Sequence, residues 1–121
     1  MSVLGELQPN KVFKYFEEIC SIPHGSRNLQ QISDYLVDFA KAHELKYRQD
    51  EDLNVIIWKD GSKGYEASEP VILQGHMDMV AVKEADCDKD MEKEGLDLEI
   101  NGDYISAKGT SLGGDDGIAV A

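Results

Sequence analysis

Two stretches in the first third of the chain carry apolar residues at helical spacing, and Pro23 separates them. The first stretch accepts Pro9 near its start, where a missing N–H costs nothing, and ends before Pro23. In the second stretch, Ser26 can cap a helix whose apolar face continues to His43. Because each predicted helix has one apolar face that must be buried, the pattern predicts a sheet that covers both.

Short strand-like runs follow the helices and supply that sheet. Residues 46–49 and 54–59 predict two strands joined by a turn, and residues 98–107 predict a hairpin around residues 101–102. Residues 71–76 form an apolar run that ends in polar residues, which predicts a buried central strand. Together these elements predict an α/β fold in which two amphipathic helices pack on a mixed sheet.

The net charge of the chain limits the kinds of partner that it is expected to bind. The chain has 121 residues, enough for one domain, with 24 Asp and Glu against 12 Lys and Arg, a formal net charge of −12. Nucleic acids and anionic membrane surfaces select basic patches, so neither is an expected partner. Cys20 and Cys87 lie far apart without a CxxC pairing, and neither an export signal nor a membrane span is evident. These features predict a cytoplasmic protein with two free thiols.

The first motif whose side chains could take part in catalysis or metal binding is His76-Met77-Asp78, at the end of the predicted central strand. Residues two apart on a strand face the same side, so the imidazole of His76 and the carboxylate of Asp78 would converge. A metal-bound imidazole usually donates its second N–H to such a carboxylate. The triplet alone is common, however, and by itself favours a histidine that ends a strand beside a solvated aspartate.

The second motif is Gly113-Gly114-Asp115-Asp116-Gly117, directly before a predicted helix that starts near Ile118. Paired carboxylates flanked by glycines suit a metal bridge, because the backbone can approach closely there. The same residues also suit a helix N-cap, in which Asp115 or Asp116 accepts free backbone N–H groups. Taken alone, this motif does not distinguish a metal ligand from a cap.

In combination the two motifs are far more specific. Residues 73–80 read Leu-Gln-Gly-His-Met-Asp-Met-Val, and residues 108–118 read Lys-Gly-Thr-Ser-Leu-Gly-Gly-Asp-Asp-Gly-Ile. In this order they resemble the aminoacyl-histidine dipeptidases (peptidase D), which belong to the di-zinc exopeptidases. Residues 16–24 and 52–57 also resemble that family, so the likeness covers essentially the whole chain.

The resemblance assigns a role to three residues. It implies that His76 is a metal ligand, that Asp115 bridges two metal ions, and that Asp78 is the catalytic carboxylate that steadies His76. The ions would be divalent, zinc first, with cobalt or manganese as alternatives. Asp116 stands where relatives commonly carry Asn, with an effect on metal affinity that the sequence leaves open. Because relatives commonly hold the bond after the bridging aspartate in cis, the resemblance also implies a cis peptide bond between Asp115 and Asp116.

The implied activity is metal-dependent hydrolysis of small peptides, Xaa-His dipeptides in particular, by a water activated between two metal ions. The resemblance makes residues 1–121 the N-terminal portion of the catalytic domain. The rest of that domain, the general base, the remaining ligands and a lid domain are expected beyond Ala121, so the chain alone is predicted to be inactive. The oligomeric state of the parent stays open, with a homodimer as one option.

Two other interpretations of the function stay open. Three further residues are expected to have structural roles. The chain could belong to a related tripeptidase or deacylase, or it could be a non-catalytic acidic α/β binding module whose motifs are only caps and turns. His24 follows Pro23 in a loop and is expected to be structural. His43 is expected to pack at a helix edge, and Trp58 to lie in the core.

Overall fold

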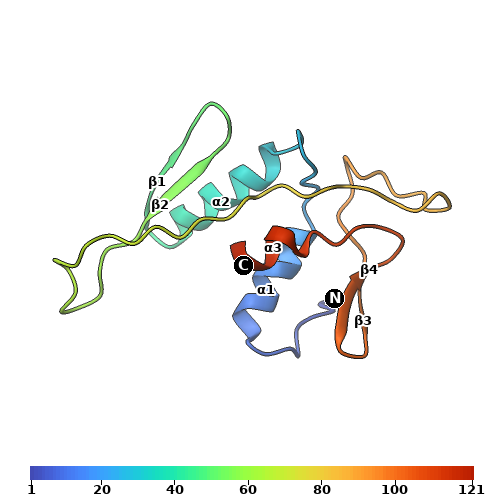
Figure 1. The fold of residues 1–121 in the computed structure, drawn as a ribbon, viewed down its shortest axis with the longest axis horizontal. Coiled ribbons are helices and arrows are strands. Elements are labelled where there is room, and N and C mark those ends of the chain that lie inside the picture. The colour runs from blue at the N-terminus through green and yellow to red at the C-terminus, as the bar shows by residue number, and fades with distance from the viewer. The chain divides into compact units, whose positions relative to one another are not determined.

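The computed structural model describes residues 1–121, which divide into two compact units. One unit joins Met1–Ile32 with Gly75–Ala121, and the other is Ser33–Gln74. No helix combines the length and the apolar character that crossing a membrane requires. The elements, drawn in Figure 1, are α1 (Asn10–Cys20), α2 (Gln30–Ala42), β1 (Lys46–Gln49), β2 (Val55–Trp58), β3 (Leu98–Asn101), β4 (Tyr104–Ala107) and α3 (Gly114–Val120).

Helix α1 forms as its apolar spacing predicts. Pro9 is its N-cap residue, and the Pro9 carbonyl accepts the N–H of Phe13 at 3.3 Å. Phe16 and Ile19 are buried, and burial of each such side chain contributes about 1.5–3 kcal/mol. A Cβ atom added to Gly117 of α3 would lie 3.3 Å from the Phe16 ring. Helix α3, which begins beside Asp115, therefore packs closely on the buried face of α1.

The β3–β4 hairpin packs on the same core. Leu98 pairs with Ala107 at the open end of the hairpin, and both residues are buried against Phe16 and Cys20. Asn101 pairs with Tyr104, so the two-residue turn comprises residues 102–103, one position later than predicted. Gly102 adopts φ +61°, a left-handed conformation that glycine tolerates without steric cost. The predicted hairpin is confirmed with this small shift.

The second unit contains the other hairpin and most of α2. Strands β1 and β2 pair antiparallel, as predicted, and the buried hydroxyl of Ser33 donates to the Leu53 carbonyl at 2.7 Å. His43 stacks on the Phe39 ring with centroids 4.1 Å apart, which confirms its place at the helix edge. The expectation for Trp58 is wrong: it is 43% exposed, and Lys46 Nζ lies 5.1 Å from the centre of its ring.

The α/β class is confirmed, but the strands form two separate antiparallel hairpins instead of one mixed sheet. The prediction of a central strand at residues 71–76 is wrong, and Figure 1 draws this stretch as an extended, unpaired segment. Val71, Ile72 and Leu73 are 83%, 89% and 92% exposed. An apolar run becomes a buried strand only when neighbouring strands pair with its backbone, and no strand of this chain does so.

Candidate metal site at His76

The two sequence motifs meet at the imidazole ring of His76. Its Nδ1 atom lies 3.0 Å from Asp78 Oδ1 and 3.0 Å from the Asp78 carbonyl oxygen. Its Nε2 atom lies 2.9 Å from Oδ1 of Asp115, 39 residues further along the chain. The three predicted site residues therefore form one cluster, with the imidazole between two carboxylates.

The start of α3 places Asp115 toward the ring. Gly113 is the N-cap residue, with φ +75°, and no side chain caps the helix. Asp115 and Asp116 both have non-helical backbone angles, and the peptide bond between them is cis, as the resemblance implies. Neither aspartate acts as the N-cap, so the alternative interpretation of this motif as a helix cap is wrong. The Asp115 side chain is instead 94% exposed, and its Oδ1 atom faces His76 Nε2 at 2.9 Å.

Asp116 contacts the site through the backbone of His76. Its Oδ2 atom accepts the His76 N–H at 3.2 Å. A Cβ atom added to Gly75 would lie only 2.8 Å from that same oxygen. Gly75 therefore leaves room for the Asp116 carboxylate, which holds the segment that carries the imidazole.

Ser26 is a further member of the cluster, although the sequence predicts a different role for it. It was expected to cap the second helix, but α2 begins only at Gln30. Its hydroxyl donates instead to Asp78 Oδ2 at 2.6 Å. The two residues are 52 positions apart, and no local pattern in the sequence signals such a contact.

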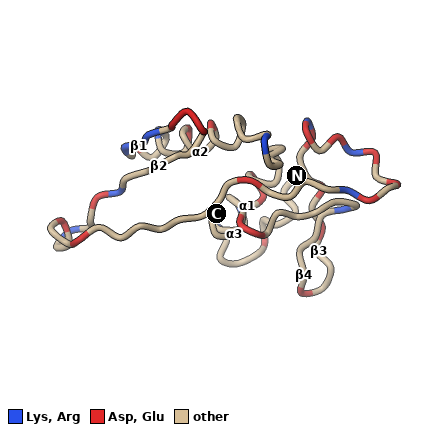
Figure 2. Tube along the Cα trace, turned by 45° about the horizontal axis from the view of Figure 1, so that its top comes forward, with Lys and Arg blue, Asp and Glu red and all other residues tan.

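The hydrogen bonds shift the ionisation of both partners. The hydrogen bond to the Asp115 carboxylate is the main cause that raises the pKa of His76 above its ordinary value; desolvation opposes it, and the two acceptors of Asp78 add to the increase. The hydroxyl of Ser26, and then the His76 imidazole, lower the pKa of Asp78. Figure 2 shows that acidic residues are spread along the chain with Lys and Arg between them. The shift at His76 thus arises from its two immediate partners and not from a concentrated acidic patch.

The geometry fits two ligands of a zinc ion. Imidazole nitrogen and carboxylate oxygen are ordinary zinc donors, and two ligands of one tetrahedral zinc lie about 3.3 Å apart. The 2.9 Å between His76 Nε2 and Asp115 Oδ1 is close to that separation. Asp78 faces the other ring nitrogen and is placed to orient the ring. The chain brings together no group of three or more His, Cys, Asp or Glu side chains arranged so that all of them could hold one metal ion.

Other candidate residues have structural roles. His24 is 2% exposed and its Nδ1 atom lies 2.6 Å from the Ile22 carbonyl oxygen, which confirms the structural expectation. Cys20 and Cys87 are both free thiols, as predicted. Burial raises the pKa of the Cys20 thiol to about 12.

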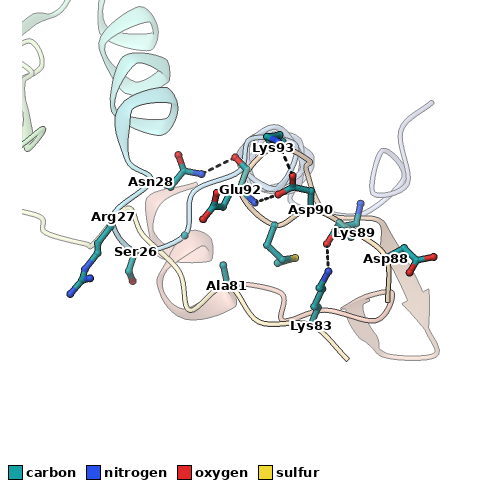
Figure 3. Close-up of a pocket in the computed structure, with 12 residues that line it drawn as sticks. Ser26, Arg27, Asn28, Ala81, Lys83, Asp88, Lys89, Asp90, Glu92 and Lys93 are labelled. Carbon is teal, nitrogen blue, oxygen red and sulfur yellow. Dashed lines mark hydrogen bonds and ion pairs between the residues drawn. The ribbon is translucent and has the colours of Figure 1, made fainter. Parts of the chain in front are cut away.

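An open pocket of about 1020 Å³ lies between residues 25–28 and residues 88–93 (Figure 3). Its walls contain one ion pair, in which Lys93 Nζ lies 3.3 Å from Asp90 Oδ2, while Lys83 Nζ donates to the Lys89 carbonyl at 2.7 Å. The pocket contains Ser26 but none of the predicted metal ligands.

Comparison with known proteins shows that the chain is homologous to dipeptidases over its whole length, which confirms the resemblance. It is 39% identical, over all 121 residues, to the cytosol non-specific dipeptidase of Escherichia coli K12, of which it covers 25%. The aminoacylhistidine dipeptidase of Vibrio alginolyticus has a similar crystal structure, with a TM-score of 0.93 and 37% identity over 98% of this chain and 24% of that one. No protein-family model matches the chain. The chain thus spans about a quarter of the length of these relatives.

Proposed function

We propose that residues 1–121 form part of the catalytic domain of a metal-dependent dipeptidase that prefers Xaa-His dipeptides. The observation that carries this proposal is the 2.9 Å contact between His76 Nε2 and Asp115 Oδ1, in a chain homologous to dipeptidases. The relatives' names describe one non-specific dipeptidase and one aminoacylhistidine dipeptidase. The Xaa-His preference is therefore the narrower part of the proposal.

The proposed cofactor is a pair of divalent ions, zinc first, with cobalt and manganese as alternatives. When bound, such ions activate a water molecule and polarise the scissile carbonyl group. His76 would hold one ion through Nε2, and Asp115 would contribute its carboxylate to both. The other ligands and the general base would come from residues outside these motifs.

Asp78 would act by fixing the His76 ring. Its Oδ1 atom and its carbonyl oxygen both lie 3.0 Å from Nδ1, so they accept the proton of that nitrogen. A proton held on Nδ1 leaves the Nε2 lone pair for a metal, and a carboxylate acceptor also increases the basicity of the ring. Asp116 would add a second restraint by accepting the His76 backbone N–H.

The net charge and the names of the relatives support a proposal for the substrate and the cellular location. The substrate would be a small peptide, and the net charge of −12 disfavours nucleic acid and anionic membrane surfaces as partners. The name of the Escherichia coli relative refers to the cytosol, and we propose the cytoplasm for this protein as well.

Calorimetry with zinc on the 121-residue chain tests the metal site. We expect His76→Ala and Asp115→Ala to abolish measurable binding, and Asp103→Ala, in the exposed β3–β4 turn, to leave it unchanged. Zinc binding that is insensitive to both site variants would contradict the metal site and favour a non-catalytic acidic binding module.

A chimaera tests the activity. Residues 1–121 would replace the matching segment of the Escherichia coli dipeptidase, and the folded product would be assayed on Xaa-His dipeptides, other dipeptides, tripeptides and acylated amino acids with zinc, cobalt or manganese. We expect dipeptide hydrolysis that His76→Ala and Asp115→Ala remove. Exclusive cleavage of tripeptides or acylated amino acids would instead support a related tripeptidase or deacylase.

A further inference from the structure

Ser26 forms the outer end of a chain of contacts that leads to the proposed metal ligands. Its Oγ donates to Asp78 Oδ2 at 2.6 Å, while Asp78 Oδ1 lies 3.0 Å from His76 Nδ1. On the far side of the ring, Nε2 faces Asp115. We propose that Ser26 is a positioning residue, which fixes the Asp78 carboxylate and thereby aims the His76 imidazole at the metal. This inference rests on the proposed function.

The physical reason lies in the freedom of a carboxylate on a short side chain. The Asp78 side chain is 36% exposed, so burial alone does not determine which oxygen faces the histidine. The hydroxyl of Ser26 engages one oxygen and leaves the other for His76. Partners of this kind tune metal sites by holding ligand orientation, even though they never touch the metal.

The backbone around Ser26 is itself fixed against the Asp78 segment. The Ser26 N–H donates to the Met79 carbonyl at 3.1 Å, and the Met79 N–H donates to the His24 carbonyl at 3.0 Å. Gly25 forms a parallel bridge with Met79, and a Cβ atom at Gly25 would lie 2.8 Å from Ala81 Cβ. Glycine therefore permits the close approach that brings the Ser26 hydroxyl to Asp78.

Both ends of this loop are anchored as well. Before Ser26, the buried His24 ring lies 2.6 Å from the Ile22 carbonyl oxygen. After it, Asn28 donates to the Glu92 carbonyl at 3.0 Å across the pocket in Figure 3. A serine held from both sides can keep one hydroxyl geometry, which positioning requires.

Zinc calorimetry on the 121-residue chain tests the proposal with Ser26→Ala and Ser26→Thr. We expect Ser26→Ala to weaken zinc binding about tenfold, the lower end of the loss seen for outer-shell partners, and Ser26→Thr, which keeps the hydroxyl, to restore it. Ser21→Ala is the matched control, because that exposed hydroxyl donates at 2.6 Å to the Glu18 carbonyl and does not touch the site. Circular dichroism confirms that each variant is folded.

Nuclear magnetic resonance gives a readout that a merely structural role would not change. In the zinc-loaded chain we expect a sharp His76 Nδ1–H signal, broadened by faster exchange with water in Ser26→Ala and sharp again in Ser26→Thr. In an Asp78→Ala background, Ser26→Ala should cause no further loss of zinc affinity, because its effect acts through Asp78.

The outcomes separate this inference from the function on which it rests. If His76→Ala abolishes zinc binding while Ser26→Ala matches the wild type in affinity and in the Nδ1–H signal, the role of Ser26 is overturned and the metal site stands. Equal losses in Ser26→Ala and Ser26→Thr would also overturn it, since the hydroxyl would then be irrelevant. If His76→Ala leaves zinc binding intact, the proposed function fails first.

Discussion

Nε2 of His76 lies 2.9 Å from Oδ1 of Asp115, at the junction of two motifs that are 39 residues apart in the sequence. The contact is possible because α3 is docked on α1 through Gly117 and Phe16, which fixes the start of α3. The non-helical backbone at Asp115 then turns its carboxylate toward the ring. The packing of the core thus determines where the second motif meets the first.

This partial ligand set predicts weak metal binding and no hydrolysis by the 121-residue chain. In the proposed site, His76 and Asp115 would give one ion two ligands and a second ion only one, whereas tightly held zinc takes three or four protein ligands. Loss of a general base alone typically lowers a rate about 10²–10⁴-fold. Calorimetry should show micromolar or weaker zinc binding, and an Xaa-His dipeptide should remain intact. Cleavage by the purified chain would refute our assignment of the residues that carry the mechanism.

The cysteines should differ sharply in reactivity while both remain reduced. Cys20 is buried beside Leu4, Phe16 and Leu98, and its pKa is raised to about 12, so it has almost no thiolate at neutral pH. Cys87 is partly exposed. A thiol reagent should therefore modify one group quickly in the folded chain, and two in the denatured, unreduced chain. A denatured chain without free thiols would contradict the predicted reducing environment.

The raised pKa of His76 predicts that protons compete with zinc above pH 6.5, the ordinary value for histidine. Because Asp115 is the main cause of the shift, Asp115→Asn should bring the titration of His76 down toward 6.5, as measured by nuclear magnetic resonance in the metal-free chain. Zinc affinity of the wild type should weaken as the pH falls through the raised value. A titration at or below 6.5 that Asp115→Asn leaves unchanged would argue against the ion pair.

The same shift fixes the sign of a contribution to stability. The pKa of His76 is higher in the folded chain than in the unfolded chain, so protonation of His76 increases the free energy of unfolding. This contribution is fully present below pH 6.5 and disappears as the pH rises through the folded-state pKa. Because His76 and Asp115 are exposed, the effect on the unfolding midpoint should be small.

Features set by neighbouring residues in the sequence were predictable. The stripe of α1 and the hairpin around Gly102 depend on local spacing and turn chemistry, and both form close to their predicted bounds. The apolar run at residues 71–76 also has a clear local pattern, but a strand needs a paired neighbour, which local spacing does not supply. Trp58 alternates as a half-buried strand residue should, yet it lies with Ile56 on the exposed face of β2, and the alternation alone does not say which face is buried.

The candidate site also contains both residues that local motifs predict and residues that only the folded structure brings together. His76, Asp78 and Asp115 could be proposed from the sequence because each lies in a short motif with recognisable chemistry, and the structure brings the three side chains together. Ser26 was not found as a member of the site, because its link to Asp78 spans 52 residues and depends on how the loop at Gly25 packs against Ala81. The same holds for Asp116, whose contact with the His76 N–H appears only in three dimensions.

Gly75 should be more important than its small size implies. Substitution by alanine would place a Cβ atom 2.8 Å from Asp116 Oδ2, and Val120 Cγ2 lies only 3.4 Å away to limit other adjustments. The short Asp116 side chain must then move, which breaks its 3.2 Å hydrogen bond with the His76 N–H. We expect Gly75→Ala to weaken zinc binding several-fold in calorimetry.

Gly114→Ala and a double variant make this prediction specific. A Cβ atom at Gly114 meets nothing within 4 Å, so that substitution introduces alanine next to the site without a clash and should leave zinc affinity unchanged. If the effect of Gly75→Ala acts through the Asp116 carboxylate, it should vanish in an Asp116→Ala background, because the oxygen that the new methyl group displaces is already gone. Residues in contact are expected to be non-additive in this way. Equal losses from Gly75→Ala in both backgrounds would show that the glycine is needed for another reason, and wild-type affinity in Gly75→Ala would show that the His76 segment does not depend on Asp116.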